Sequence, residues 1–170
     1  MRDKTIQGGP PQDLQAARDD RPAGEAADPA PALQRCGQHT FYRRDDVLVW
    51  QGRGDMNQPD IATLFEQRSA LQRQHGRAFL LVDARQLSGV SAEGRRFAAQ
   101  FKPEPPLRGL TVVFGAGLLT RAAVSLVVGA ARFFGWRGTQ AAVFADDEAQ
   151  GWALIERERL ALGGGRADGR

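Results

Sequence analysis

Asp83, Ser88 and Ser91 are the residues whose types and spacing could perform chemistry, since they follow one another at the end of the apolar run FLLVDA. A carboxylate at a strand end can act as a general base, and a hydroxyl at a helix start can accept a phosphoryl group. No second acid, histidine or lysine stands at a fixed spacing from Asp83, so we predict a turn-forming or capping role for it. We predict that Ser91 caps the next helix, with phosphorylation as the alternative role.

Other reactive residue types are few and widely spaced. The single cysteine, Cys36, excludes an internal disulfide and a cysteine-based metal site. His39 and His75 have no ligand-like spacing with acids, which predicts two surface histidines and no bound metal. The segment FGAGLLTR has a G-x-G but lacks a third glycine, so a tight turn is expected and a phosphate cradle is the alternative. We therefore predict no catalytic residue, no cofactor, no metal and no enzymatic activity.

The chain of 170 residues is long enough for one domain with tails. Residues 1–36 hold five of the nine prolines and no aromatic residue, which predicts a disordered N-terminal arm. Residues 163–170, GGGRADGR, predict a flexible C-terminal tail. The domain itself is expected over residues 37–162.

The formal net charge of +3 is small, and no basic face is interleaved with aromatic residues, so nucleic acid is not an expected partner. The N-terminus shows no apolar run behind its charges, which predicts a protein of the cytoplasm.

Hydrophobic period and helix-ending residues predict an α/β order of elements. The first helix should begin after Asn57 and end at Gly76, the second should begin after Ser91, and the last should be capped by Asp146 or Asp147. In the last helix Ala149, Trp152 and Ile155 are expected to face inward. The expected strands are HTFYRR and VLVWQGR as a hairpin, then FLLVDA, GLTVVF and AAVFA. This order predicts a mixed, mostly parallel sheet of about five strands with about four helices.

A further helix, expected over residues 118–135, has two apolar sides. Arg121, Ser125 and Arg132 share one narrow stripe, whereas Leu119, Leu126 and Phe133 follow one another at seven-residue steps. One side can pack on the sheet, and the other either is covered within the domain or binds an apolar partner or a membrane surface. The uncharged stretch 122–131 is about half the length of a membrane span. The candidate binding face comprises Leu119, Arg121, Leu126, Arg132 and Phe133.

Three segments carry a resemblance to a known family: FLLVDARQLSGVSAEGRRFAAQF, LRGLTVVFGA and FADDEAQGWALI. With the order of elements, they resemble the SpoIIAA-like branch of the STAS-type proteins over roughly residues 38–160. These are small bacterial domains related in shape to anti-sigma-factor antagonists and to lipid-binding CRAL-TRIO (SEC14-like) domains. The resemblance implies a single SpoIIAA-like α/β domain with a regulatory or hydrophobic-ligand role.

In phospho-regulated STAS antagonists an Asp-Ser pair begins a helix, and a partner kinase phosphorylates that serine. The resemblance places this pair at Ser91 and Ala92, with the family glycine kept at Gly94. The position that would be modified therefore has no hydroxyl.

Two functions follow as expectations. The first is a non-enzymatic regulatory or protein-interaction module of STAS type, which binds a protein partner or self-associates. The alternative is a carrier or sensor of an apolar ligand or lipid, with helix 118–135 as a lid or as an element in peripheral contact with the inner membrane. The sequence specifies neither the partner, the ligand, the oligomeric state nor the pathway.

Overall fold

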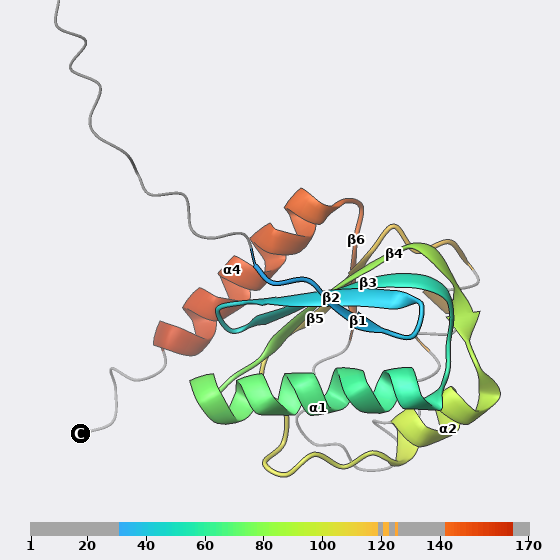
Figure 1. The fold of residues 1–170 in the computed structure, drawn as a ribbon. Coiled ribbons are helices and arrows are strands. Elements are labelled where there is room, and N and C mark those ends of the chain that lie inside the picture. The colour runs from blue at the N-terminus through green and yellow to red at the C-terminus, as the bar shows by residue number, and fades with distance from the viewer. Residues whose placement is uncertain (1–30, 119–120, 123–124, 126–141, 165–170) are drawn as a thin grey trace, which may run out of the picture. The chain divides into compact units, whose positions relative to one another are not determined.

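A computed structural model describes residues 31–118, 121–122, 125 and 142–164, which include a six-stranded sheet and three helices (Figure 1). The strands lie in the sheet in chain order, with β1/β2 and β2/β3 antiparallel and the other three pairs parallel. The strands are β1 (Gln34–Cys36), β2 (His39–Arg44), β3 (Val47–Met56), β4 (Phe79–Val90), β5 (Thr111–Phe114) and β6 (Val143–Ala145). The helices are α1 (Gln58–His75), α2 (Ala92–Gln100) and α4 (Glu148–Gly164).

The predicted mixed, mostly parallel α/β fold is confirmed, with one strand more than expected. That strand is β1, in which Cys36 pairs with His39 across the turn at Gly37. Its residues 34–36 were predicted to belong to the disordered arm, so the arm cannot extend to residue 36. The composition of β1 gives no strand signal because Gln34 and Arg35 are exposed and pair through backbone groups. The rest of the predicted arm, residues 1–30, lies outside the described residues.

The two faces of the sheet are covered by different helices, with α1 and α2 on one face and α4 on the other (Figure 1). Side chains alternate between the faces along each strand. In β3, Leu48 and Trp50 join the core cluster with α1, whereas Val47 and Val49 join the cluster with α4. In α4, Ile155 is buried as predicted and Trp152 is half-buried. Ala149, in contrast, is exposed, and the small Gly151 faces the sheet beside Leu81.

Helix α1 begins and ends where the sequence predicted. The Asn57 side chain accepts a hydrogen bond from the Asp60 backbone N–H, and the Asp60 carboxylate accepts one from the Asn57 N–H. This reciprocal pair satisfies two backbone donors of the first turn. At the other end Gly76 adopts φ 73°, the left-handed conformation that favours glycine.

Arg68 is a fully buried cation in α1 with three neutral acceptors. Its guanidinium donates to the carbonyls of Ala78 (3.2 Å) and Gly109 (2.7 Å) and to the hydroxyl of Thr111 (2.7 Å). Burial lowers the pKa of Arg68 to about 10, so the side chain remains charged at neutral pH. Arg68 therefore fixes α1 to the starts of β4 and β5.

Asp46, the residue before β3, joins α4 to the same end of the sheet. This buried carboxylate accepts hydrogen bonds from Arg77 at 2.6 Å and from Arg159 in α4. Burial alone would raise the pKa of Asp46, but the hydrogen bonds and charges of Arg159 and Arg77 outweigh it and lower the pKa. Asp46 is therefore ionised at neutral pH and holds the two arginines together.

We predict that Arg68→Leu lowers the free energy of unfolding by about 2–4 kcal/mol, because buried carbonyls would lose their donors. Urea unfolding measures the change. The matched control is Arg73→Leu on the exposed side of the same helix, which should stay within about 0.5 kcal/mol of the wild type. Equal effects of the two substitutions would contradict this role of Arg68.

Asp46→Asn should lower the free energy of unfolding by about 1–3 kcal/mol at pH 7. An Asp in the unfolded chain titrates near pH 3.9, and the folded-state pKa is lower, so the stabilisation is complete above about pH 4 to 5 and is lost as the pH falls through the folded-state value. Urea unfolding of both proteins at pH 7 and pH 3 should therefore show a smaller difference at pH 3. A difference that is the same at both pH values would contradict the ion-pair account.

Candidate functional site: a polar concavity over the middle of β3 and β4

A row of polar side chains crosses four neighbouring strands. Arg35 pairs with Thr40, Thr40 with Gln51, and Gln51 with Asp83. Because side chains alternate along a strand, Gln51 and Asp83 lie on the same face as Val49 and Leu81, which pack against α4. The α4 face of the sheet is thus apolar toward the starts of β3 and β4 and polar over their middle.

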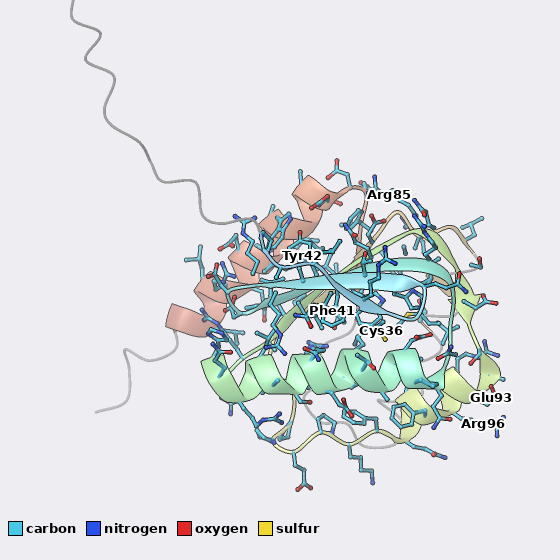
Figure 2. All side chains as sticks on the ribbon, in the orientation of Figure 1. Cys36, Phe41, Tyr42, Arg85, Glu93 and Arg96 are labelled. Carbon is cyan, nitrogen blue, oxygen red and sulfur yellow. The ribbon has the colours of Figure 1, made fainter. Side chains whose placement is uncertain are left out.

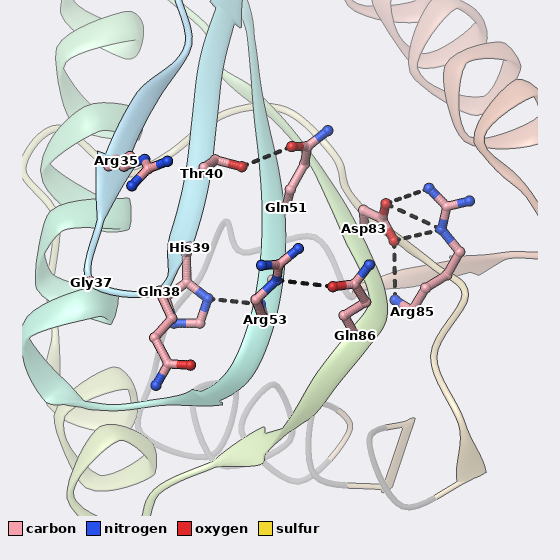
Figure 3. A pocket seen from close by; sticks show the side chains of 11 residues that line it. Arg35, Gly37, Gln38, His39, Thr40, Gln51, Arg53, Asp83, Arg85 and Gln86 are labelled. Atoms are coloured by element: carbon pink, nitrogen blue, oxygen red, sulfur yellow. Dashed lines mark hydrogen bonds and ion pairs between the residues drawn. The ribbon is translucent and has the colours of Figure 1, made fainter.

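This polar part of the sheet is hollowed into a concavity of about 540 Å³ (Figure 3). The Thr40 hydroxyl donates to Gln51 Oε1 at 2.8 Å, and Arg53 Nε donates to Gln86 Oε1 at 3.0 Å. Three arginines, Arg35, Arg53 and Arg85, are exposed here. The lining residues are Arg35, Gly37, Gln38, His39, Thr40, Gln51, Gly52, Arg53, Asp83, Arg85 and Gln86.

Asp83 lies in this concavity, paired with Arg85. Its carboxylate accepts the Arg85 backbone N–H at 3.0 Å and the Arg85 guanidinium at 2.6 Å. The hydrogen bonds from Arg85 lower the pKa of Asp83 more than burial raises it. A carboxylate held ionised in this way is a poor proton carrier at neutral pH, and its bond to the Arg85 amide supports the backbone of β4.

Ser88 and Ser91 lie elsewhere. The strand expected over FLLVDA does not end there but continues as β4 to Val90, and Ser88 is an exposed residue of that strand. The expectation failed because β4 pairs with β3 through two register shifts, and the apolar pattern shows neither of them.

Ser91 is the N-cap residue of α2, as predicted. Its hydroxyl accepts the Gly94 N–H at 3.0 Å. Ala92, the next residue, is exposed. Gly94 packs so closely that an added Cβ would lie 2.9 Å from Ile61 Cδ1, which explains a glycine at this position without any chemical role.

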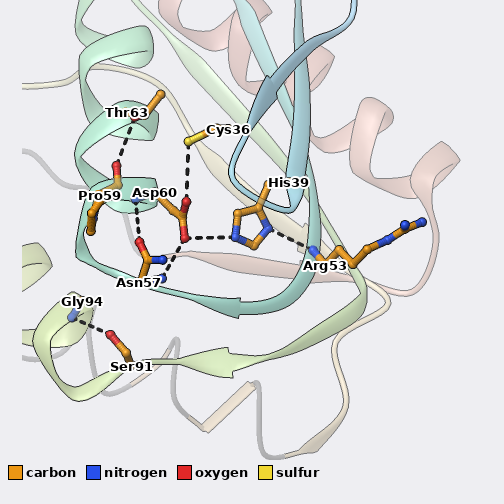
Figure 4. Close-up of polar contacts among 9 residues, drawn as sticks. All are labelled: Cys36, His39, Arg53, Asn57, Pro59, Asp60, Thr63, Ser91 and Gly94. Carbon is orange, nitrogen blue, oxygen red and sulfur yellow. Dashed lines mark hydrogen bonds and ion pairs between the residues drawn. The ribbon is translucent and has the colours of Figure 1, made fainter.

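His39 was predicted to lie on the surface, but it is 1% exposed and hydrogen-bonded through both ring nitrogens (Figure 4). Nδ1 accepts the backbone N–H of Arg53 at 3.0 Å, so Nε2 carries the hydrogen and donates to Asp60 Oδ2 at 3.3 Å. The alternation of HTFYRR, which places His39 on the same side as Phe41, was the signal that could have predicted this burial.

Cys36 extends the same network, since its Sγ lies 3.6 Å from Asp60 Oδ1. Burial and the nearby Asp60 charge raise the pKa of the Cys36 thiol, although Thr63 opposes the effect. The thiol therefore stays protonated at neutral pH, and this group is suited to structure rather than to nucleophilic attack. Among the described residues no group of three histidine, cysteine or acidic side chains could hold a metal ion.

The predicted apolar face lies mostly outside the described residues, as Leu119, Leu126, Arg132 and Phe133 all do. Arg121 is described: its Nε donates to the Ala116 carbonyl at 3.0 Å, and its guanidinium lies 5.3 Å from the centre of the Phe144 ring. No helix within the described ranges is long and apolar enough to cross a membrane.

No protein-family model and no curated protein sequence matches the chain. It is similar to the crystal structure of an uncharacterized DUF3478-family protein with a SpoIIAA-like fold from Shewanella loihica PV-4, at 15% identity and a TM-score of 0.42, covering 74% of this chain and 92% of that one. It is also similar to the anti-sigma factor antagonist SpoIIAA in its unphosphorylated form, at 14% identity and a TM-score of 0.39, covering 76% of this chain and 98% of that one.

Asp60→Ala should lower the free energy of unfolding by about 2–4 kcal/mol, because α1 loses a capping partner and the buried His39 Nε2–H loses its acceptor. Urea unfolding measures the loss. Glu66→Ala, on the exposed side of α1, is the control and should change stability by less than about 0.5 kcal/mol. A loss for Asp60→Ala no larger than that of the control would contradict the proposed network.

Proposed function

We propose that this domain is a non-enzymatic regulatory or protein-interaction module of STAS type, acting in the cytoplasm, which binds its partner without a phosphoryl switch at the start of α2. The observation that carries the proposal is the exposed Ala92 directly after the N-cap Ser91. In the phospho-regulated antagonists that the sequence resembles, this position holds the modified serine. Here a methyl group occupies it, so the same surface can bind a partner but cannot be modified at that position.

Hydrogen bonds and close packing fix the junction of β4 and α2, where such a partner would bind. The Ser91 N–H donates to the Met56 carbonyl at 2.9 Å, and the Arg95 guanidinium donates to the Val90 carbonyl. The buried Gly94 brings α2 close to α1. These contacts hold the start of α2 in place before a partner arrives, which lowers the ordering cost of binding.

Exposed side chains of both charges surround Ala92. Figure 2 shows Glu93 and Arg96 at the start of α2, well apart from Arg85 at the concavity. A small apolar centre with a charged rim is a common arrangement of protein interfaces, in which the rim contributes mostly to partner choice. A protein partner, or a second copy of this chain, fits this surface better than a small molecule does.

We expect a photo-crosslinking residue placed at Ala92 in the full chain, expressed in the native host, to give a discrete cross-linked product with a protein partner or a second copy. Arg157, exposed on α4, is the control position and should not give that product. Glu93→Arg should remove the product by reversing one rim charge. Equal products at both positions, or none at Ala92, would contradict the proposal.

Phosphopeptide mapping tests the missing switch separately. We expect no stoichiometric phosphate on Ser91 or Ser88 in protein isolated from its host. The Ser91 hydroxyl already accepts the Gly94 N–H, so modification would have to replace a cap that α2 uses. Stoichiometric phosphate on either serine would show that a switch exists.

One observation favours the alternative, a carrier or sensor of an apolar ligand or lipid. Leu118, at the start of the expected helix 118–135, is 88% exposed, close to Arg121. If the alternative holds, the protein should co-sediment with vesicles containing anionic lipid, and Leu118→Glu should weaken that binding. Absence of wild-type co-sedimentation would rule out the membrane-facing form of the alternative.

A further inference from the structure

We propose that the concavity over the middle of β3 and β4 is a binding site for a small phosphorylated, hydroxyl-bearing molecule of the sugar-phosphate class. Arg35 and Arg53 hold the phosphate, and the neighbouring amide and hydroxyl side chains bind the hydroxyl groups. This site lies apart from the start of α2, so it is independent of the proposed interaction surface.

The charge of the concavity matches a dianion. Three arginines line it, and the one carboxylate among its described lining residues, Asp83, is already paired with Arg85. Within the part of the chain that the structure describes, neither Arg35 nor Arg53 forms an ion pair. Two unpaired positive charges remain, on Arg35 and Arg53. They balance the two negative charges that a phosphate monoester carries above its second pKa, about 6.

Arg53 has free donors in a suitable geometry. Its Nε–H is used by Gln86 Oε1, which leaves the two terminal nitrogens of the guanidinium free to bind an anion. The guanidinium fork binds two phosphate oxygens at once, and charge-assisted bonds of this kind are about twice as strong as neutral ones. Arg35 lines the same concavity from the edge strand β1, which lies two strands away from the β3 strand of Arg53 (Figure 3).

The other lining side chains suit hydroxyl groups rather than a flat base. Gln38, Gln51 and Gln86 offer amide donors and acceptors, and Thr40 offers a hydroxyl. His39 is the one aromatic ring among the described lining residues, and it is buried with both nitrogens occupied. A nucleotide base would therefore find no exposed ring on which to stack, whereas a sugar would find several hydrogen-bonding partners.

The site is fixed before the ligand binds. The Arg53 backbone N–H donates to His39 Nδ1, and the Thr40 hydroxyl donates to Gln51, so two adjacent strands are held in register at the concavity. A volume of about 540 Å³ lies within the range of small-molecule sites.

The direct test is an NMR titration of the ¹⁵N-labelled full chain with inorganic phosphate, at constant ionic strength maintained with chloride. We expect saturable shifts of the Arg53 amide and of the Arg35 and Arg53 side-chain Nε–H signals. Arg35→Gln and Arg53→Gln should each weaken the binding by about fivefold to tenfold. Arg96→Gln, an exposed arginine on α2, is the control and should leave the binding unchanged.

Shifts that do not saturate, or that are equal at the exposed arginines of α2, would overturn the proposal. The fold of each variant is checked by its amide spectrum, so a loss of binding in a folded Arg53→Gln protein can be assigned to the side chain. Because Arg53 and Arg35 are exposed, we expect both variants to fold.

A second titration tests the class of ligand. Glucose 6-phosphate should bind more tightly than inorganic phosphate, and Gln51→Leu should reduce this advantage without weakening the binding of phosphate itself. Failure of glucose 6-phosphate to bind more tightly than phosphate would refute the sugar-phosphate assignment. An octaglutamate peptide that bound more tightly than glucose 6-phosphate would refute it as well, because the site would then suit an acidic protein segment.

Discussion

The buried imidazole of His39 is the contact on which the arrangement of the domain depends. Through Nε2 it reaches Asp60, which caps α1, and through Nδ1 it accepts the backbone N–H of Arg53 in β3. Both ring nitrogens are used inside the protein, so neither group is left unsatisfied on burial. The His39 side chain of β2 thereby links the start of α1, which covers one face of the sheet, to strand β3, which carries Arg53.

The α4 face of the sheet differs in polarity between the starts and the middle of β3 and β4. At the starts of β3 and β4 the α4 face is apolar. There the buried Asp46 forms ion pairs with Arg77, which precedes β4, and with Arg159 of α4. In the middle of these strands the same face carries Gln51 and Asp83 and opens as the concavity. The start of α2 provides a second, separate surface. The proposed partner surface at α2 and the proposed anion site on the sheet are therefore separate.

Local signals in the sequence predicted the local features well. The caps Asn57, Gly76 and Ser91 depend on residues within one helical turn, and all three lie where the sequence placed them. Buried apolar strands such as Phe79–Val82 were equally visible, because parallel strands covered on both faces read as continuous apolar runs. The mixed α/β class followed from the order of these elements.

Features that depend on pairing between distant segments were missed. Strand β1 has no apolar signal, and the continuation of β4 beyond Asp83 depends on register shifts against β3. The burial of His39 requires Asp60, which lies 21 residues further along the chain. The concavity gathers Arg35, Arg53 and Arg85 from three strands, and only the register brings them together.

Observation of the hydrogen on the His39 ring tests this account most directly. Long-range ¹H–¹⁵N NMR of the full chain distinguishes a ring protonated at Nε2, at Nδ1 or at both nitrogens. We expect His39 to be the Nε2–H tautomer with a bare Nδ1 at pH 7, and the exposed His75 serves as the reference in the same spectrum. A His39 ring that carries its hydrogen on Nδ1, or on both nitrogens, could not accept the Arg53 amide and would contradict the account.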